Sequence, residues 1–415
     1  MTLSGLRAGP LAQREFRLLF GGRVVSMLGN QIAPIGLAFA VLGLTGSKSD
    51  LGLVLAARSL PQVLFLLFGG VLADRFPRHR VMVASDAVSW ASQGALAALL
   101  LSGHAQLWHL LALAAVNGAS SAFFLPASSG IVPQTVPAEQ LQRANAMLRL
   151  GLNASAIVGP ALGGILVAAT SPGWALAADA ASFALGALFV ARMRVRHLRP
   201  LRPPSMLREL AEGWREFRSR TWLWTIVLQF AVVNAAFGGA LNVLGPVQAE
   251  RHLGGAAAFG AVLSAEAIGF AGGALLMLRF HPRRILLAAT LGMLVSAAPL
   301  VLLGIPTALV AITAAALVAG IGLEIFGVLW DTAMQQEIPP EKLSRVYSYD
   351  GFGSYVLVPV GLAVAGPIAG AVGIRTAIWG GAALIVAATL AVLFVRDVRG
   401  LERKDVADER NLGTA

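Results

Sequence analysis

The chain has 415 residues, of which 57% are hydrophobic and only 13% charged, and its formal net charge is +11. This composition excludes an ordinary soluble domain, and the length leaves room for about twelve apolar helices of roughly 20 residues each. The absence of cysteine excludes disulfides and thiolate metal or redox sites.

Apolar runs bounded by charged residues, or by glycine and proline, predict the elements of the chain. We expect twelve membrane-spanning helices, which cover residues 18–44, 51–73, 81–102, 108–132, 144–170, 174–195, 221–249, 256–280, 285–304, 307–332, 344–371 and 375–396. The fold class is therefore an all-α membrane protein.

The positions of the basic residues predict the orientation in the membrane. Most of the 32 Lys and Arg residues lie at the chain ends and in every second loop, whereas the loops of the other side carry only Lys48, Arg251 and Arg375. Because basic residues gather on the cytoplasmic side, both termini are predicted to be cytoplasmic, in a bacterial inner membrane. The same spread over short loops argues against nucleic acid as a partner.

The longest polar segment, 192–220, contains nine arginines and is interpreted as a linker between two halves. Its later part, LRELAEGWREF, has apolar residues at helical spacing with arginines opposite, namely Leu207, Leu210, Trp214 and Phe217. This pattern predicts an amphipathic helix on the inner leaflet of the membrane. The alternative is a regulatory or partner-binding site.

An internal repeat supports two halves. VPQTVPAEQLQRA from Val132 matches MQQEIPPEKLSRV from Met334, and VGPALGG from Val158 is echoed by AGPIAGA from Ala365. Such repeats are typical of transporters that bind substrate between two halves and work by alternating access. The predicted domains are a six-helix bundle (1–191), the linker (192–220), a second, pseudo-symmetric six-helix bundle (221–396) and a cytoplasmic tail (397–415).

The loop after the second predicted helix reads GGVLADRFPRHR. It resembles the loop signature of the major facilitator superfamily, although Pro77 stands where Gly is usual and His79 where a basic residue is usual. An Asp in such a turn can accept bonds from a helix N-terminus. The resemblance implies an inner gate formed by Gly70, Asp74, Arg75, Arg78 and Arg80.

The fifth predicted helix contains the pairs Gly159-Pro160 and Gly163-Gly164. They are similar to the exporter-associated motif of the same superfamily, which normally begins with another Gly where this chain has Ser155. The structural alternative is that these residues only allow close helix approach and a bend.

Longer stretches, including REFRLLFGGRVVSMLGNQI and LWDTAMQQEIPPEKLSRVYSYD, resemble the branch of enterobactin exporters and macrolide efflux proteins, the transmembrane secretion effector type. This resemblance implies a multi-pass antiporter for proton-coupled export of a small amphipathic drug or metabolite, with multidrug resistance as its phenotype. The expected partners are substrate, protons and membrane lipid, and we expect a monomer. An importer, or a non-transporting receptor or scaffold, remains the alternative.

Enzymatic activity is not expected from the sequence. The six histidines are scattered, none pairs with an acid at the spacing of metal ligands, and no nucleotide-binding loop occurs. We therefore expect no catalytic residue, no cofactor and no metal site.

An acidic residue inside a membrane-spanning helix costs free energy of insertion, so its presence there suggests a function. Asp86 and Asp179 lie within two turns of a membrane face, which favours a structural role for both. Glu266, Glu324 and Asp350 lie deeper, where desolvation disfavours the ionised form, and we assign them to proton coupling. Alternatively, these acids only hold helices together through hydrogen bonds.

Other polar residues fall on helices that line the cavity in the family. Arg58 lies roughly 10 Å from the outer end of its helix and needs an acid or a carbonyl as partner, which suggests a salt-bridge or gating role. The candidate residues of the substrate cavity are Asn30, Gln31, Arg58, Gln229, Asn234 and Asn242. Arg23 and Arg149 lie close enough to the cytoplasmic face to extend their charged ends to it.

Overall fold

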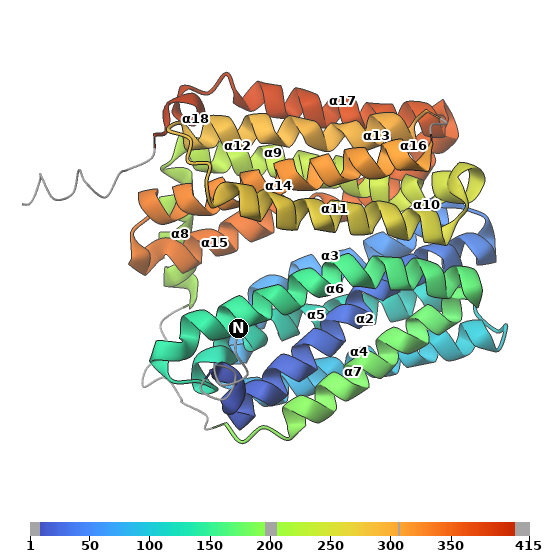
Figure 1. Cartoon of the computed structure of the whole chain (residues 1–415), viewed down its shortest axis with the longest axis horizontal. Coiled ribbons are helices and arrows are strands. Elements are labelled where there is room, and N and C mark those ends of the chain that lie inside the picture. Colours follow the sequence, from blue (N-terminus) through green and yellow to red (C-terminus); the bar gives the residue numbers. More distant parts are fainter. Residues whose placement is uncertain (1–8, 196–205, 306–307, 403–415) are drawn as a thin grey trace, which may run out of the picture. The chain divides into compact units, whose positions relative to one another are not determined.

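The computed structural model describes residues 9–195, 206–305 and 308–402, and in this part of the chain we find helices and no β-strand (Figure 1). The segments that correspond to the predicted spans are α2 (Arg14–Thr45), α3 (Lys48–Arg75), α4 (Arg78–Leu101), α5 (Leu107–Ile131), α6 (Leu141–Ala169), α7 (Pro172–Ala191), α9 to η5 (Thr221–Leu253), α11 (Ala256–Met277), α12 to α13 (Ile285–Leu303), α14 (Leu309–Glu337), α15 with α16 (Pro340–Tyr355 and Val358–Val372) and α17 (Ile374–Val392). The predicted all-α membrane architecture is confirmed.

Ten of these segments are long and apolar enough to cross a membrane by length and composition alone. The other two, α3 and α4, carry more polar residues in the described part of the chain. Lys48, Asp50 and Arg58 lie in α3, and α4 contains Asp86, Gln93 and three serines. Such residues need partners inside the bundle, because lipid offers none.

Short helices connect the spans. α8 (Met206–Arg218) lies in the segment predicted as the linker, and α18 (Arg396–Gly400) follows the last span. One-turn helices precede α2 and α6, namely η1 (Pro10–Ala12), η2 (Val132–Gln134) and η3 (Ala138–Gln140). The two copies of the sequence repeat thus lead into α6 and α15, which are the fifth helices of the two predicted halves.

Three spans are irregular. The seventh runs from α9 (Thr221–Phe237) through the π-helical turn η4 (Gly238–Val243) and α10 (Leu244–Gln248) to a second π-helical turn, η5 (Ala249–Leu253). The ninth contains the 3-10 turn η6 (Leu294–Ala297) between α12 (Ile285–Met293) and α13 (Ala298–Leu303). The eleventh breaks between α15 and α16, just before Pro359, which cannot donate a backbone hydrogen bond.

Glycine ends the first and seventh spans. Gly46 at φ 64° closes α2, and its N–H donates to the carbonyl of Leu42 over 2.8 Å. Gly254 at φ 95° closes η5. Left-handed backbone at these positions strongly favours glycine, which explains why the helices end there.

The helices pack into two compact units. Unit 1 comprises the described residues of Met1–Pro203, Gly238–Ser264 and Val358–Ala377, and unit 2 those of Pro204–Phe237, Ala265–Leu357 and Ile378–Ala415. Two of the crossings between units coincide with irregular helix, at the start of η4 and at the break between α15 and α16. The division of the sequence into bundles at 191 and 221 stays a prediction.

Unit 1 is built on close helix pairs. α2 packs along α7, α4 packs along α5 and α7, and α3 packs along α5 (Figure 1). A hydrophobic cluster fills the end of the unit where α2 begins, and it includes Phe16, Met82, Ile131, Leu148 and Val190. In unit 2, α12 packs on α14, and α15 packs on both α8 and α9.

Candidate functional site

A cavity of about 390 Å³ lies inside unit 2, between α9, α11, α14 and α15, with η6 closing one wall. Its lining is mostly apolar, with a small number of polar groups, as is usual for small-molecule sites. The polar lining residues are Asn234, Glu266, Ser296, Asp350 and Ser354. The aromatic ones are Phe230, Phe237, Phe270, Phe326, Trp330 and Tyr355.

The aromatic side chains support one another. The rings of Phe230 and Phe326 lie 4.4 Å apart, and Phe326 stacks on Trp330 with centroids 6.1 Å apart. Trp222 packs edge-on against Trp330 at 5.6 Å from behind the lining. Because Phe326 and Trp330 are four residues apart on α14, both rings lie on the same helix face. The cavity wall is therefore a preformed aromatic surface.

Asp350 is held in a fixed orientation at this wall. Its Oδ2 accepts a hydrogen bond from Nε1 of Trp330 over 3.1 Å, and its Oδ1 accepts one from Oγ of Ser354 over 3.3 Å. Nδ2 of Asn234 donates to the backbone carbonyl of Ser354 over 3.0 Å. Asn234 thus binds a carbonyl next to the break in the eleventh span, which holds α15 in place beside α9.

Glu266 lines the cavity from α11, and within the described residues its carboxylate has no hydrogen-bond or ion-pair partner. The backbone of α11 meets α14 at this position. A Cβ added at Gly320 would overlap with the carbonyl oxygen of Glu266. Glycine at 320 therefore lets the helix that carries Glu266 approach α14 closely.

Glu324 lies apart from these two acids. It is on α14 but does not line the cavity, and its Cβ lies 2.8 Å from where a Cβ of Gly273 would be. Nearby, the hydroxyl of Tyr347 donates to Oδ1 of Asp331 over 2.9 Å. This hydrogen bond links α14 to α15. Glu266 and Asp350 share the cavity, whereas Glu324 packs from α14 against α11 at Gly273.

Only one of the six residues predicted for the substrate cavity lines the cavity of unit 2. That residue is Asn234. Gln229 is 3% exposed, and its Nε2 donates to Oγ1 of Thr389 on α17 over 3.1 Å, away from the cavity. The others belong to unit 1, namely Asn30, Gln31, Arg58 and Asn242.

In unit 1 these residues have separate surroundings. Nδ2 of Asn30 donates to the carbonyl of Ser26 over 3.1 Å, within its own helix. The backbone of Arg58 packs so tightly on α5 that a Cβ at Gly118 would overlap with its carbonyl oxygen. Asn242 is exposed on η4.

The residues of the predicted inner gate lie at the end of α3 and the start of α4. Gly70, Asp74 and Arg75 belong to α3, but their side chains lie outside the described part of the structure. Arg78 is half-buried and Arg80 exposed in the first turn of α4. The inner gate therefore stays a prediction.

The Gly-Pro motif of the fifth span lies at a crossing of three helices within unit 1. A Cβ at Gly159 would overlap with Cβ of Gln31 on α2, and one at Gly163 would lie 3.0 Å from the carbonyl oxygen of Ile32. A Cβ at Gly164 would lie 2.6 Å from the carbonyl oxygen of Ala256 on α11. The motif thus allows close approach of α6 to α2 and α11.

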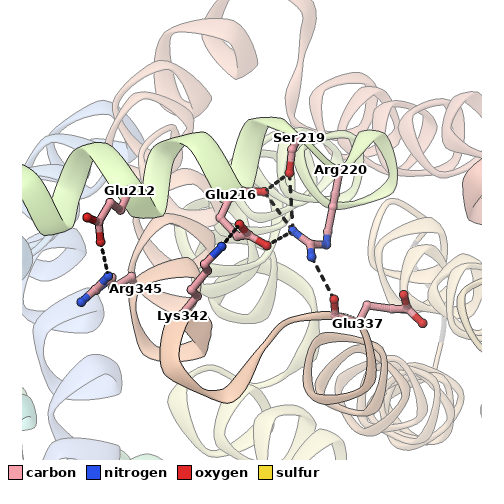
Figure 2. A network of polar contacts seen from close by, with 7 residues as sticks. All are labelled: Glu212, Glu216, Ser219, Arg220, Glu337, Lys342 and Arg345. Carbon is pink, nitrogen blue, oxygen red and sulfur yellow. Dashed lines mark hydrogen bonds and ion pairs between the residues drawn. The ribbon is translucent and has the colours of Figure 1, made fainter.

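The linker helix α8 is fastened to the start of α15 by polar contacts, shown in Figure 2. Nη1 of Arg345 donates to Oε2 of Glu212 over 2.6 Å, and Nζ of Lys342 donates to Oε2 of Glu216 over 2.8 Å. Arg220 binds Glu216 and donates from Nη2 to the carbonyl of Glu337 over 3.0 Å. We call the residues Glu212, Glu216, Arg220, Glu337, Lys342 and Arg345 the linker clamp.

The aromatic face of α8 lies against α15 as well. Trp214 and Phe217 stack with centroids 5.7 Å apart, and Tyr349 lies 5.6 Å from Trp214 and 5.9 Å from Phe217. Phe217 is buried, whereas Trp214 is 49% exposed. Part of the apolar face predicted to contact lipid is therefore covered by protein.

Sequence reasoning missed the aromatic lining of the cavity. The available signal was the recurrence of aromatic residues at helical spacing, at Phe230 and Phe237 on α9 and at Phe326 and Trp330 on α14. Polar residues inside spans were selected from the sequence instead, because these cost free energy of insertion unless they find a partner. An aromatic residue in an apolar run has no such cost and therefore does not stand out.

Comparison with known proteins supports a transporter. The model of the Major Facilitator Superfamily matches residues 19–361. The chain is 23% identical to macrolide efflux protein A of Streptococcus pyogenes, over 94% of this chain and 98% of that protein. It is 26% identical to the multidrug efflux pump Tap of Mycobacterium tuberculosis (strain ATCC 25618 / H37Rv), over 96% of this chain and 98% of that protein.

Solved structures show the same fold. A bacterial homologue of the iron transporter ferroportin, in an inward-facing state, matches with a TM-score of 0.71 at 14% identity, over 92% of this chain and 98% of that one. The nucleoside transporter NupG matches with a TM-score of 0.65 at 15% identity, over 91% of this chain and 98% of that one. The relatives and the family are transporters and not enzymes. This chain is a multi-pass membrane protein that belongs to the major facilitator superfamily.

Proposed function

We propose that the chain exports a small amphipathic molecule that carries a positive charge, in exchange for protons, by alternating access. The observation that carries this proposal is the cavity of unit 2, where the carboxylates of Glu266 and Asp350 stand in an aromatic wall. A carboxylate in an apolar cavity attracts a cation, and aromatic faces add to this attraction. Aromatic rings also bind the apolar part of such a molecule.

Export is favoured by the relatives over their whole length. Both efflux proteins align with more than nine-tenths of the chain, and their names describe the removal of macrolides or of several drugs. At 23% and 26% identity they support a transport direction and a broad substrate class. We therefore infer outward transport of a drug-like amphipathic molecule.

Alternating access agrees with the irregular spans. The seventh and eleventh spans cross from one compact unit to the other at a π-helical turn and at a helix break. Irregular turns of this kind often mark hinges, because their backbone hydrogen bonds are already displaced. We infer that these two positions bend during the transport cycle.

The distribution of basic residues supports an orientation in the membrane. We place both termini and the linker in the cytoplasm of a bacterial inner membrane, and we expect the chain to work as a monomer. Reporter fusions at Lys48 and Arg199 should report outside and inside, respectively. The reverse result would overturn the proposed orientation, since the asymmetry of basic residues favours only one of the two possible orientations in the membrane.

Asp74 is proposed to belong to an inner gate, on the strength of the loop motif. Asp74→Asn should lower transport strongly while expression stays near normal. Undiminished efflux at normal expression would count against the gate.

Flux measurements test the function itself. The purified full chain, reconstituted into proteoliposomes, should move a fluorescent lipophilic cation against its gradient when a pH gradient is imposed. A neutral analogue of the same dye should move much less. Movement of the dye in the same direction as the protons would indicate an importer, and no flux of any test compound would favour a receptor or scaffold.

A further inference from the structure

Two carboxyl groups are buried in the interior of unit 1. Asp179 on α7 is 0% exposed and Asp86 on α4 is 2% exposed, which makes them more buried than any acid of the cavity. The sequence favoured a structural role for both, because they lie within two turns of a membrane face. Their surroundings do not fit a structural ion pair.

Neither carboxyl has a cationic partner. No Lys, Arg or His side chain among the described residues lies within ion-pair distance of Asp86 or Asp179. Oδ2 of Asp179 accepts a hydrogen bond from Nε2 of Gln93 over 2.7 Å, whereas Oδ1 of Asp179 and Oδ2 of Asp86 are buried without a hydrogen-bond partner in the described structure. Because an unpaired charge in such an interior costs several kcal/mol, the neutral carboxylic acid is the form that this packing accommodates.

Hydroxyl groups connect the two acids along the contact between α2 and α7. Oγ of Ser182 donates to the backbone carbonyl of Asp179 over 2.7 Å, and Oγ of Ser26 donates to the carbonyl of Ser182 over 3.4 Å. Ser26 lies next to Gly186, and a Cβ at Gly186 would lie 3.1 Å from Oδ2 of Asp86. A polar strip thus leads from Asp86 through Ser26 and Ser182 to Asp179.

The helices pack closely on one another around this strip. A Cβ at Gly29 would overlap with Oγ of Ser182 and lie 2.8 Å from Oδ1 of Asp179, and a Cβ at Gly186 would overlap with Oγ of Ser26. A metal cation such as calcium needs several oxygen ligands around one point. Among the described residues, no group of three or more His, Cys, Asp or Glu side chains is arranged to hold a metal ion. A proton needs no space beyond the carboxyl itself.

We propose that Asp86 and Asp179 form a second proton-binding site of the transporter, inside the N-terminal helices and separate from the cavity of unit 2. Protons on both carboxyls stabilise the tight contacts of α7 with α2 and α4. Loosening of that contact admits water, which favours the ionised forms and releases the protons. Since a ligand shifts a conformational equilibrium by its differential affinity for two states, proton binding here biases the transport cycle.

Few other charges face the strip. Arg58 on α3 is close enough for its charge to act on Asp179, although it forms no ion pair with it. Arg23 on α2 is half-buried, and its Nε has no partner in the described structure. Two further helices lie close to these. The one titratable residue of α5 is His109, which lies in the first turn of that helix, and Arg149 of α6 is exposed. Among the described residues, Arg58 is therefore the cation placed to stabilise Asp179 once it has lost its proton.

Infrared spectroscopy of the full chain in lipid tests this proposal without any substrate. The carbonyl stretch of a protonated carboxyl group is separate from the bands of an ionised carboxylate. The amplitude of this carbonyl band therefore measures how many carboxyl groups are protonated. We expect Asp86→Asn and Asp179→Asn each to remove one carboxyl's share of this band at neutral pH. Asp50→Asn, which changes an acid in the first turn of α3, should leave the band unchanged.

Two further measurements keep the test decisive. Labelling of all aspartates with carbon-13 in the wild-type chain should shift the band, which covers the case in which a variant fails to fold. Asp179→Glu should restore the band with an altered pH midpoint. If the band keeps its full amplitude in both Asn variants, or if aspartate labelling shifts no part of it, the two acids are ionised and the proposal is wrong, whatever the transport assays show.

Discussion

Arg345 of α15 donates from Nη1 to Oε2 of Glu212 on α8, over 2.6 Å. Arg345 belongs to the second copy of the sequence repeat, and its counterpart in the first copy, Arg143, is exposed at the start of α6. The two copies of the repeat therefore differ in the contacts that this arginine makes. The second copy fastens the linker to the eleventh span of the chain, so a movement of the linker acts directly on the helix that carries Asp350.

Glu216→Gln should loosen α8 from α15. Glu216 accepts hydrogen bonds from both Lys342 and Arg220 and is only 14% exposed, so its loss breaks the centre of the linker clamp. We expect about 1 kcal/mol of local destabilisation, or roughly fivefold faster hydrogen exchange of the α8 amides. Glu250→Gln, which changes an exposed acid on η5, should leave this exchange unchanged.

The linker clamp should also respond to pH. The hydrogen bond from Lys342, together with Arg220, holds the pKa of the Glu216 carboxyl below its ordinary value. A lowered pKa means that the clamp is complete above the ordinary pKa of glutamate and weakens as pH falls through the lowered value. Exchange of the α8 amides, corrected for intrinsic rates, should therefore rise on acidification in wild type. The same profile in Glu216→Gln would show that another group is responsible.

Gly164→Ala should destabilise unit 1. The added Cβ would lie 2.6 Å from the carbonyl oxygen of Ala256 and 3.0 Å from Cα of Ala257, and backbone atoms cannot move aside as a side chain can. Overpacking of this kind costs about 1–3 kcal/mol. Gly43→Ala is the matched control, because nothing lies within 4 Å of a Cβ at that position of α2. Thermal unfolding in lipid should separate the two variants, and equal midpoints would contradict the close crossing of α6 and α11.

Trp330→Phe should weaken the binding of cationic compounds. The substitution keeps an aromatic ring at the cavity wall but removes the Nε1–H that fixes Asp350. Loss of one hydrogen bond to a charged group corresponds to about 1.5–3 kcal/mol, so we expect the dissociation constant for a lipophilic cation to rise roughly ten- to hundredfold. A neutral analogue should bind as before. Trp224→Phe, on an exposed face of α9, serves as the control in the same titration, and an equal loss there would rule out the specific role of Trp330.

Much of the fold could be predicted from the sequence, because lipid forces each span to be a long apolar helix. The ends of the helices were harder to predict from the sequence. The apolar run of the tenth span stops near residue 332, for example, but α14 continues to Glu337. The break of the eleventh span was also missed. Pro359 alone did not reveal it, because proline is tolerated in membrane helices when neighbours satisfy the freed backbone groups. At the break itself, Asn234 binds the carbonyl of Ser354.

Residues of the candidate site could be predicted only where their depth in a membrane-spanning helix pointed to a function. Glu266 and Asp350 were selected because an acid deep in a span needs an explanation, and both line the cavity. Gln229 was selected because its helix lines the cavity in the family, but its side chain faces Thr389, since the sequence does not reveal which face of a helix meets the cavity. Depth also understated the burial of Asp86 and Asp179, since helices packed on all sides bury a residue even two turns from the membrane face.

One acid of the cavity is placed to couple proton movement to transport. Glu266 and Asp350 line the cavity, but Asp350 already accepts hydrogen bonds from Trp330 and Ser354, whereas Glu266 has no partner in the described structure. An acid without fixed donors can exchange its proton for a bound cation, because both compete for the same carboxylate. Glu266 is therefore our first choice for the coupling acid, and Glu324, which does not line the cavity, is not placed for that competition.

Amide substitutions in proteoliposomes separate these roles. Glu266→Gln should lower flux driven by a pH gradient at least about tenfold, while substrate still exchanges across the membrane without a gradient, because the variant can bind and rock but cannot carry the proton. Asp350→Asn should weaken substrate binding in both modes, since it removes a charge held in the wall. Glu324→Gln should retain gradient-driven flux unless it unfolds, which thermal unfolding would reveal. If Glu266→Gln, Glu324→Gln and Asp350→Asn all keep full gradient-driven transport, none of the three acids couples protons, and the pathway must run through other groups, of which Asp86 and Asp179 are the first to test.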